Sequence, residues 1–172
     1  TVLLLDSPIV VHLLQKLEQE DDKLGFVRVD ADHIDKLIAK DEPQLSKLSD
    51  EEKETLKPLI ENVVPKEQYT VQLEAMDSEA APFMITQPEF MRRMKEMQQT
   101  GGGGMFGGGF PDMYQLVVNV NHPLVSQILE TKTKKKQERL IKQSLDLARL
   151  SQSLLKGEEL TAFIKRSFDM IK

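Results

Sequence analysis

A glycine-rich run interrupts the chain between Phe90 and Phe110, FMRRMKEMQQTGGGGMFGGGF, and it limits what the residues around it can fold into. Seven of the nine glycines and four of the eight methionines of the 172-residue chain lie in this stretch. Glycine loses more conformational freedom on ordering than any other residue, so residues 100–110 are expected to behave as a flexible tether. The regular elements that the sequence predicts therefore lie before and after this tether.

The composition indicates a soluble globular chain with a highly charged surface, because 40% of its residues are hydrophobic and 30% are charged. The net charge of −5 gives the molecule as a whole no electrostatic attraction to nucleic acid or to anionic lipid. No apolar run approaches the roughly 20 residues that a membrane span needs. Neither nucleic acid nor a membrane is therefore an expected partner. The absence of cysteine excludes disulfide bonds and thiolate metal sites, and it fits a reducing compartment.

Residues 1–40 predict a strand–helix–strand unit that forms the end of a preceding domain. Val2–Leu5 is a short apolar run of the buried-strand type. Ser7 and Pro8 follow as the N-cap and the first residue of a helix, and Phe26–Val29 alternates like a second strand. Since the chain opens on a strand-like run without a signal peptide, we expect it to be a piece of a longer protein.

Residues 41–172 predict an α+β domain built around a small three-stranded antiparallel sheet. Apolar and polar residues alternate strictly over Tyr69–Ala75, which indicates a half-buried strand. Phe83–Thr86 is expected to form a second, shorter strand, and Met113–Asn121 a third.

Two further helices are expected to flank these strands. Ser49 begins a capping box, S-D-E-E, at the start of the first helix. Pro58 lies inside this helix and is expected to kink or shorten it. Asn121 and Pro123 are expected to start the second helix, over residues 124–130.

The last third of the chain predicts a hairpin of two amphipathic helices. The first helix covers Lys134–Lys156 and is expected to stop at Gly157. The second helix carries apolar residues at i, i+3, i+4, i+8 and i+11, starting from Leu160.

The first helix of this hairpin has apolar residues on more than one face. Leu140, Leu147 and Leu154 share a face, and Leu145 and Leu150 lie off it. Because a three-stranded sheet is small to cover, one face is expected to cover it and the other to meet a second copy. A two-fold pair of such hairpins makes a four-helix bundle. The alternative is that both faces close a single monomeric core.

A short helix over residues 88–99 is predicted to carry a narrow apolar stripe. Phe90, Met94 and Met97 fall at i, i+4 and i+7, and Met91 flanks them. The usual place of such a stripe is the core of the subunit. Methionine, however, is unbranched and polarisable, and a helix tied to a flexible tether is weakly anchored. We therefore expect this helix to project and to offer an exposed, adaptable apolar surface.

The sequence contains no motif of catalysis, cofactor binding or metal binding. The glycine run lacks the Lys-Ser/Thr ending of a phosphate-binding loop. His12, His33 and His122 are isolated, without the spacing of metal ligands. The basic run over residues 132–139 is expected to be a solvated surface, with phosphate contact as the alternative. The chain is therefore not expected to be an enzyme.

The C-terminal dimerisation domain of bacterial heat-shock protein 90 resembles the chain in the segments LKPLIENV, YTVQLEAMDSEAAPFMI, PEFMRRMKEM, YQLVVNVNHPLV and LLKGEELTAFIKRS. The end of that family's middle domain is similar to VLLLDSPIVVHLLQKLE. The resemblance covers essentially the whole chain and depends on element order together with local sequence. It implies one segment of an ATP-dependent molecular chaperone that assists protein folding in the stress response.

This resemblance implies a cytoplasmic homodimer, joined by a four-helix bundle, whose projecting helix touches unfolded client proteins. Client contact is then expected at Phe90, Met91, Met94 and Met97. ATP and Mg belong to an N-terminal domain of the family that this chain does not contain, so neither a bound cofactor nor ATP hydrolysis is expected here. The expected dimer contacts are Leu147, Leu150, Leu154, Leu155, Phe163, Ile164, Phe168 and Ile171.

Two other classes of function remain as alternatives. A methionine helix beside a glycine run also suits a signal-sequence-binding module of a protein-targeting particle. Such a module needs a strongly basic RNA-binding surface, which a net charge of −5 disfavours. The other alternative is a catalytic domain whose residues converge only in space, and the sequence shows no paired polar residues that favour it.

Overall fold

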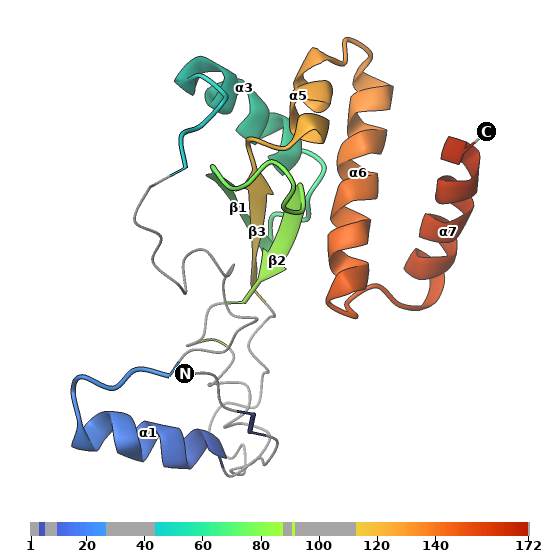
Figure 1. The fold of residues 1–172 in the computed structure, drawn as a ribbon. Helices are drawn as coiled ribbons and strands as arrows, with labels where there is room; N and C mark the ends of the chain where they lie inside the picture. Colours follow the sequence, from blue (N-terminus) through green and yellow to red (C-terminus); the bar gives the residue numbers. More distant parts are fainter. Residues whose placement is uncertain (1–3, 6–9, 27–43, 88–90, 92–112, 172) are drawn as a thin grey trace.

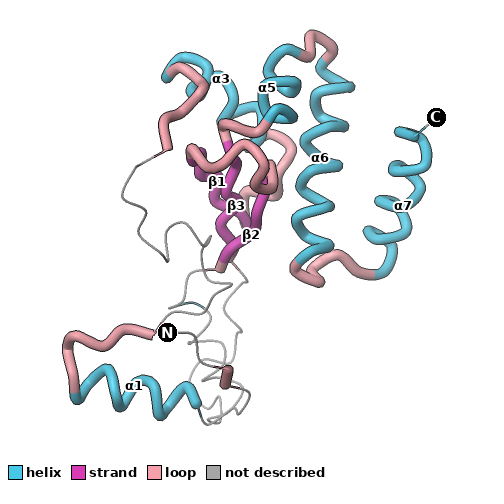
Figure 2. Tube along the Cα trace, viewed as in Figure 1, coloured by secondary structure: helices cyan, strands magenta, loops and turns pink. Residues whose placement is uncertain are grey.

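The computed structural model of the chain describes residues 4–5, 10–26, 44–87, 91 and 113–171, and these form an α+β fold, as the sequence predicts (Figures 1 and 2). The described helices are α1 (Val10–Glu20), α3 (Asp50–Glu61), α5 (Pro123–Glu130), α6 (Lys134–Ser151) and α7 (Gly157–Ile171). The strands are β1 (Tyr69–Glu74), β2 (Phe83–Thr86) and β3 (Tyr114–Asn119). The predicted helix at 88–99 and the tether at 100–110 lie outside the described residues, apart from Met91.

The three strands form a mixed sheet with the order β1–β3–β2. β3 pairs parallel with β1, so that Tyr69 lies opposite Tyr114, and antiparallel with β2, so that Phe83 lies opposite Val118. The prediction of an antiparallel sheet is therefore wrong. The chain reverses direction between β1 and β2 and again between β2 and β3. β1 and β3 consequently run the same way, and their adjacency makes the pairing parallel.

β3 occupies the centre of the sheet because it is apolar on both faces. Leu116, Val117 and Val118 are all 0% exposed, which is the pattern of a strand covered on both sides. The flanking strand β1 alternates at its start, with Tyr69 and Val71 buried and Thr70 exposed between them. The core therefore extends to both sides of the central strand.

Helices α3 and α6 supply much of the cover for this sheet. α3 contacts β1, and α6 contacts β2, α3 and α5. Figure 1 shows α6 standing between the sheet and α7, and α1 lying apart from the sheet. The core cluster combines buried side chains of α3, the three strands, α5 and α6, among them Leu56, Ile60, Val71, Ile85, Leu116, Val125, Ile128 and Ile141.

The predicted capping box at the start of α3 is confirmed. The Ser49 Oγ atom accepts a hydrogen bond from the Glu52 N–H at 3.2 Å, and the Glu52 carboxylate accepts one from the Ser49 N–H at 2.8 Å. Pro58 does not shorten the helix, which continues to Glu61. Ile60, in the turn after the proline, is 0% exposed. The burial of Ile60 therefore compensates for the helix hydrogen bond that Pro58 cannot donate.

The expected N-cap of α5 is wrong by one residue. The imidazole of His122, not Asn121, accepts the hydrogen bond from the Leu124 N–H, at 3.0 Å. The Asn121 side chain instead accepts from the Lys47 N–H at 2.7 Å and donates to the Met76 carbonyl at 3.0 Å. Asn121 therefore ties two loops to the end of β3, and these long-range bonds replace the local cap.

α6 ends at Ser151 and not at the predicted position before Gly157. Ser153 takes the left-handed conformation with φ +57°. Its N–H bonds to the Leu150 carbonyl at 3.0 Å, and the following N–H bonds to the Arg149 carbonyl at 2.9 Å. This is a Schellman motif with serine in the position that glycine usually takes. Gly157, which also has φ +57°, starts α7 instead.

Candidate self-association surface on helices α6 and α7

α6 presents its apolar face to the sheet and α5. Ile141, Leu145 and Ala148 are each at most 4% exposed. Gln137 lies on the same face and donates from Nε2 to the Ile128 carbonyl of α5 at 2.8 Å. These buried positions repeat at i, i+4, i+8 and i+11, so one side of α6 is buried along its length within the protomer.

A second set of apolar side chains points away from the core. On α6, Leu147 is 52% exposed and Leu150 is 41% exposed. On α7, Ile164 is 46%, Phe168 is 65% and Ile171 is 81% exposed. We call these five residues the apolar stripe. Soluble monomers rarely leave large contiguous apolar surfaces uncovered, and such surfaces mark sites of protein interaction.

The eight residues expected at the dimer interface therefore fall into two groups. Five of them make up the apolar stripe. Leu155 and Phe163 are buried within the protomer, and Leu154 packs against the core. The expected grouping of the α6 leucines also changes, because Leu145 is buried against the protomer while Leu147 is exposed. Met170, which was not among the predicted contacts, is also 40% exposed near the end of α7.

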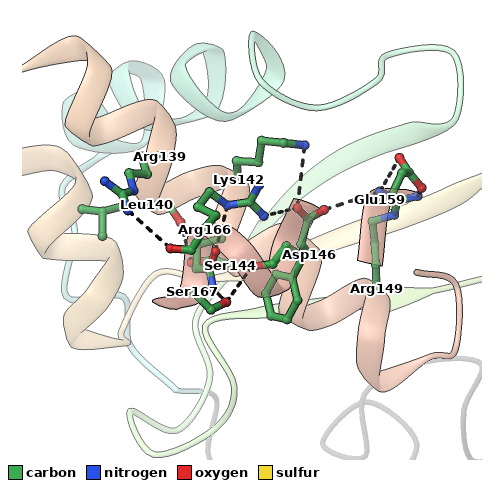
Figure 3. A network of polar contacts seen from close by, with 11 residues as sticks. Arg139, Leu140, Lys142, Ser144, Asp146, Arg149, Glu159, Arg166 and Ser167 are labelled. Atoms are coloured by element: carbon green, nitrogen blue, oxygen red, sulfur yellow. Dashed lines mark hydrogen bonds and ion pairs between the residues drawn. The ribbon is translucent and has the colours of Figure 1, made fainter. Parts of the chain in front are cut away.

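Between the two helices lies a set of polar contacts centred on Asp146 (Figure 3). The Asp146 side chain is only 3% exposed, and its carboxylate is paired with Arg166 of α7. The same carboxylate lies 3.4 Å from Nη1 of Arg149 and 3.7 Å from Nζ of Lys142, both on α6. A buried carboxylate is tolerated only with such charged partners.

Further hydrogen bonds join α6 to α7 on both sides of Asp146. Arg149 donates from both Nη atoms to the two carboxylate oxygens of Glu159, at 3.0 and 2.6 Å. Gln143 donates to Ser167 Oγ at 2.7 Å and accepts from Nε of Arg166 at 2.9 Å. The contacts between the two helices that we call the polar seam involve Arg139, Gln143, Asp146 and Arg149 of α6 with Glu159, Arg166 and Ser167 of α7.

The electrostatics of the seam follow from these contacts. The hydrogen bond from Arg149 holds the pKa of the Glu159 carboxyl below its ordinary value of 4.5. The same hydrogen bond, with Glu159 as acceptor, raises the pKa of Arg149. Burial raises the pKa of Tyr69 above 10.0, and the nearby Arg149 opposes that shift. Arg149 therefore lies where α6, α7 and β1 come together.

The contacts of the polar seam were not predicted from the sequence. Lys142, Asp146 and Arg149 are spaced at i, i+4 and i+7, which signals a charged helix face. That signal could have drawn attention to Asp146. It could not have identified Glu159 and Arg166 as partners, because they lie 10 and 20 residues from Arg149 and Asp146 and meet α6 only after the chain turns back.

The expected client-contacting residues lie almost entirely outside the part of the chain that the structure describes. Phe90, Met94 and Met97 are outside it, and Met91 is half-buried. The exposed apolar surface expected of them stays a prediction.

The described residues show no second site with evident chemistry. A shallow cavity of about 240 Å³ between α3 and α6 has Leu59, Val63 and Ile141 in its lining, and it is smaller than the roughly 300–1,000 Å³ of ordinary ligand pockets. The basic residues Lys132 and Lys134 at its edge are exposed. Among the described residues, no three His, Asp or Glu side chains cluster as a metal site would require. None of the described helices combines the length and apolarity needed to cross a membrane.

Comparisons with known proteins relate the sequence to one class of protein. No protein-family model matches the chain. A chaperone of Porphyromonas gingivalis strain W83 is 40% identical to it over 92% of the chain. A chaperone of Bacteroides thetaiotaomicron is 30% identical across an alignment that includes 99% of the chain. The class to which the sequence is related is therefore that of the molecular chaperones.

Both relatives are the chaperone protein HtpG. The chain is related to the HtpG chaperones over a part of their length, which confirms the family resemblance seen in the sequence. It spans 23% of the Porphyromonas protein and 35% of the Bacteroides protein. The alignment with the Bacteroides protein extends over 237 positions, so that relative contains residues without a counterpart among the 172 of this chain.

Proposed function

We propose that this chain is the dimerisation and client-contacting segment of an ATP-dependent chaperone. In this proposal α6 and α7 of two copies form a four-helix bundle, and the helix at 88–99 meets unfolded or partly folded proteins. The observation that carries the proposal is the apolar stripe on two helices of a chain related to HtpG.

The stripe supports a second copy as its occupant. α6 already covers the sheet with Ile141, Leu145 and Ala148, so the stripe is not needed for the core of the protomer. Two antiparallel helices with a shared apolar side are half of a four-helix bundle, and a two-fold axis supplies the other half from the same surface. Self-association buries the stripe without a further kind of protein.

Sedimentation of the unmodified chain and of Phe168→Asp tests the dimer. Phe168 is 65% exposed in the protomer, so the aspartate is tolerated in the monomer, whereas it places an unpaired charge in the proposed bundle. We expect a dimer for the unmodified chain and a monomer for the variant. The matched control is Ala162→Asp, which adds the same charge at an exposed position on another side of α7 and should remain dimeric. A dimeric Phe168→Asp variant would refute this interface.

Client contact is the second part of the proposal. The methionine-rich stripe of residues 88–99 suits a surface that meets many sequences, because methionine adapts its shape at little cost. Replacing Phe90 and Met94 together with serine should weaken the suppression of aggregation of an unfolded protein while stability is kept. The control pair, Arg92→Ser with Glu96→Ser, lies on the other side of the predicted helix and keeps the net charge. A large loss of stability in Phe90→Ser with Met94→Ser would show instead that the methionine-rich stripe of residues 88–99 belongs to the core.

The remaining parts of the proposal concern the whole chaperone. ATP and Mg are bound and ATP is hydrolysed by other parts of the protein, and the dimer keeps two such arms at high effective concentration. A cytoplasmic location and a role in the stress response follow from the family. The relatives give no support to the alternative of a signal-sequence-binding module.

A further inference from the structure

α7 is attached to its own protomer mainly by polar contacts. Among the residues of α7, all of which are described, Phe163 alone is buried. A helix of 15 residues is marginal in water without tertiary packing. One buried side chain permits many orientations of α7 on α6, because apolar burial has no strong directional preference. The contacts that specify one orientation are those of the polar seam.

Asp146 makes the position of α7 specific. Its carboxylate is 3% exposed, and Arg166 is the partner that α7 brings to it. If α7 stayed packed on α6 but turned or slid along it, the carboxylate would lose this partner while the helix still shielded it from water. Breaking a buried ion pair in this way is far costlier than losing an exposed one. Asp146 therefore penalises every arrangement of α7 in which Arg166 does not reach it.

The seam contacts α7 at two places about two turns apart. Glu159 in the first turn meets Arg149 in a two-pronged hydrogen bond, and Arg166 and Ser167 further along meet Asp146 and Gln143. A bidentate pair of arginine and carboxylate has a defined geometry. Two contact points along an axis set both the rotation of α7 and its register on α6.

The seam brings the two halves of the apolar stripe to the same side. On α6, Leu147 and Leu150 lie to one side of the seam residue Asp146 when the helix is projected down its axis. On α7, Ile164 and Phe168 lie to one side of Phe163, which faces α6. Because the two helices run antiparallel (Figure 1), both sets project from the same side of the pair. A small rotation of α7 would separate them.

We propose that the polar seam sets the geometry of self-association, with Asp146 and Arg166 as positioning residues. This inference rests on the dimer proposed above. The seam does not itself touch the second copy in this account. It holds α7 so that one continuous apolar surface faces the partner, and it thereby selects a second copy with the same arrangement.

The test compares Arg166→Gln, Asp146→Asn and the double variant. Each single change leaves a buried or half-buried charge without its main partner, and the double change leaves two neutral groups that can hydrogen-bond. We expect each single variant to weaken the dimer, measured as a dissociation constant by dilution and sedimentation, by about tenfold or more. The double variant should recover part of that loss. Lys165→Gln removes the neighbouring, exposed charge and is the matched control, with an unchanged constant.

Hydrogen exchange of the isolated protomer, diluted well below the dissociation constant, gives the second measurement. In Arg166→Gln the amides of α7 should lose protection while those of β3 keep it. The inference is overturned if the dissociation constants of the single variants stay within about twofold of the unmodified chain, or if the double variant recovers nothing. These outcomes differ from failure of the dimer proposal, in which the unmodified chain is already monomeric and Phe168→Asp changes nothing.

Discussion

α6 meets the sheet and α7 through two chemically different faces. Toward the sheet, Ile141 and Leu145 are at most 2% exposed and fill space in the core. Toward α7, Gln143, Asp146 and Arg149 make directed hydrogen bonds and ion pairs. Apolar burial supplies most of the stabilising free energy but little direction, whereas charged hydrogen bonds supply direction and modest net stability. The same helix thus stabilises the protomer on one side and positions a binding element on the other.

The largest effect on stability is expected from truncating a side chain of the apolar core. Leu116→Ala in the central strand removes a side chain that is 0% exposed, and the lost burial and the cavity should cost roughly 2–5 kcal/mol of the free energy of unfolding. Urea denaturation of the dilute chain measures this. Leu147→Ala, on the exposed side of α6, is the control and should change protomer stability by less than about 0.5 kcal/mol. Equal losses in the two variants would contradict the contrast between the buried core and the exposed side of α6.

A smaller loss of stability is expected from removing a buried polar side chain in the core. Asn119 is 0% exposed, accepts from the Met76 N–H at 3.2 Å and donates to the Asp77 carbonyl at 2.6 Å. Asn119→Ala leaves both backbone groups short of a partner, so a loss of about 2–3 kcal/mol is expected in urea denaturation. Asn62→Ala, at an exposed position, should have little effect. If both variants were equally stable, the bonds of Asn119 would contribute nothing to stability.

A gain in stability is expected from a change in the turn that joins α6 to α7. Ser153 has φ +57°, a conformation that costs a residue with a side chain more than it costs glycine. Ser153→Gly should therefore raise the free energy of unfolding by about 0.5–1 kcal/mol. Ser151→Gly, inside the helix, is the control and should lower it by a similar amount. A thermal melt of the two variants distinguishes these signs, and destabilisation by Ser153→Gly would contradict the Schellman motif.

The smallest effect concerns the pH dependence of the polar side. The pKa of Glu159 is lowered in the folded chain, so its bond to Arg149 stabilises α7 above pH 4.5 and is lost as the pH falls through the folded pKa. The Glu159 side chain is 59% exposed, so the contribution is expected to stay below about 1 kcal/mol.

Hydrogen exchange of α7 measures this contribution. At pH 7 the unmodified chain should be more protected than Glu159→Gln, and the difference should shrink as the pH falls below 4.5. Glu158→Gln, an exposed neighbour without a contact to Arg149 among the described residues, is the control. A difference that grew toward acid pH would contradict the sign of this shift.

Much of the local structure could be predicted from the sequence. The alternation over Tyr69–Ala75 identified β1 to within one residue, and the predicted Phe83–Thr86 strand has the bounds of β2. The capping box at Ser49 marked the start of α3 correctly. These features depend on residues within a few positions of one another, which is why a pattern along the chain reveals them.

Two of the errors concern places where a second residue took the role that the sequence assigned to the first. Asn121 is a good N-cap residue, but its amide bonds to distant backbone groups and His122 caps the helix instead. Gly157 is a good helix stop, but Ser153 takes the left-handed position first. In both cases local preference indicated a suitable residue, and a competing contact decided which residue took the role.

For this protein, the sequence by itself determined the α+β class, the places of the described strands and helices, the helical hairpin at residues 134–171 and the relationship to a chaperone family. Only the tertiary structure decided that β1 and β3 run parallel, that Leu145 is buried while Leu147 is exposed, and that Asp146 meets Arg166. The physical reason is range. Hydrogen bonding within a helix and alternation along a strand are set by neighbours in the chain, whereas strand direction, burial and ion pairing depend on which distant segments come together.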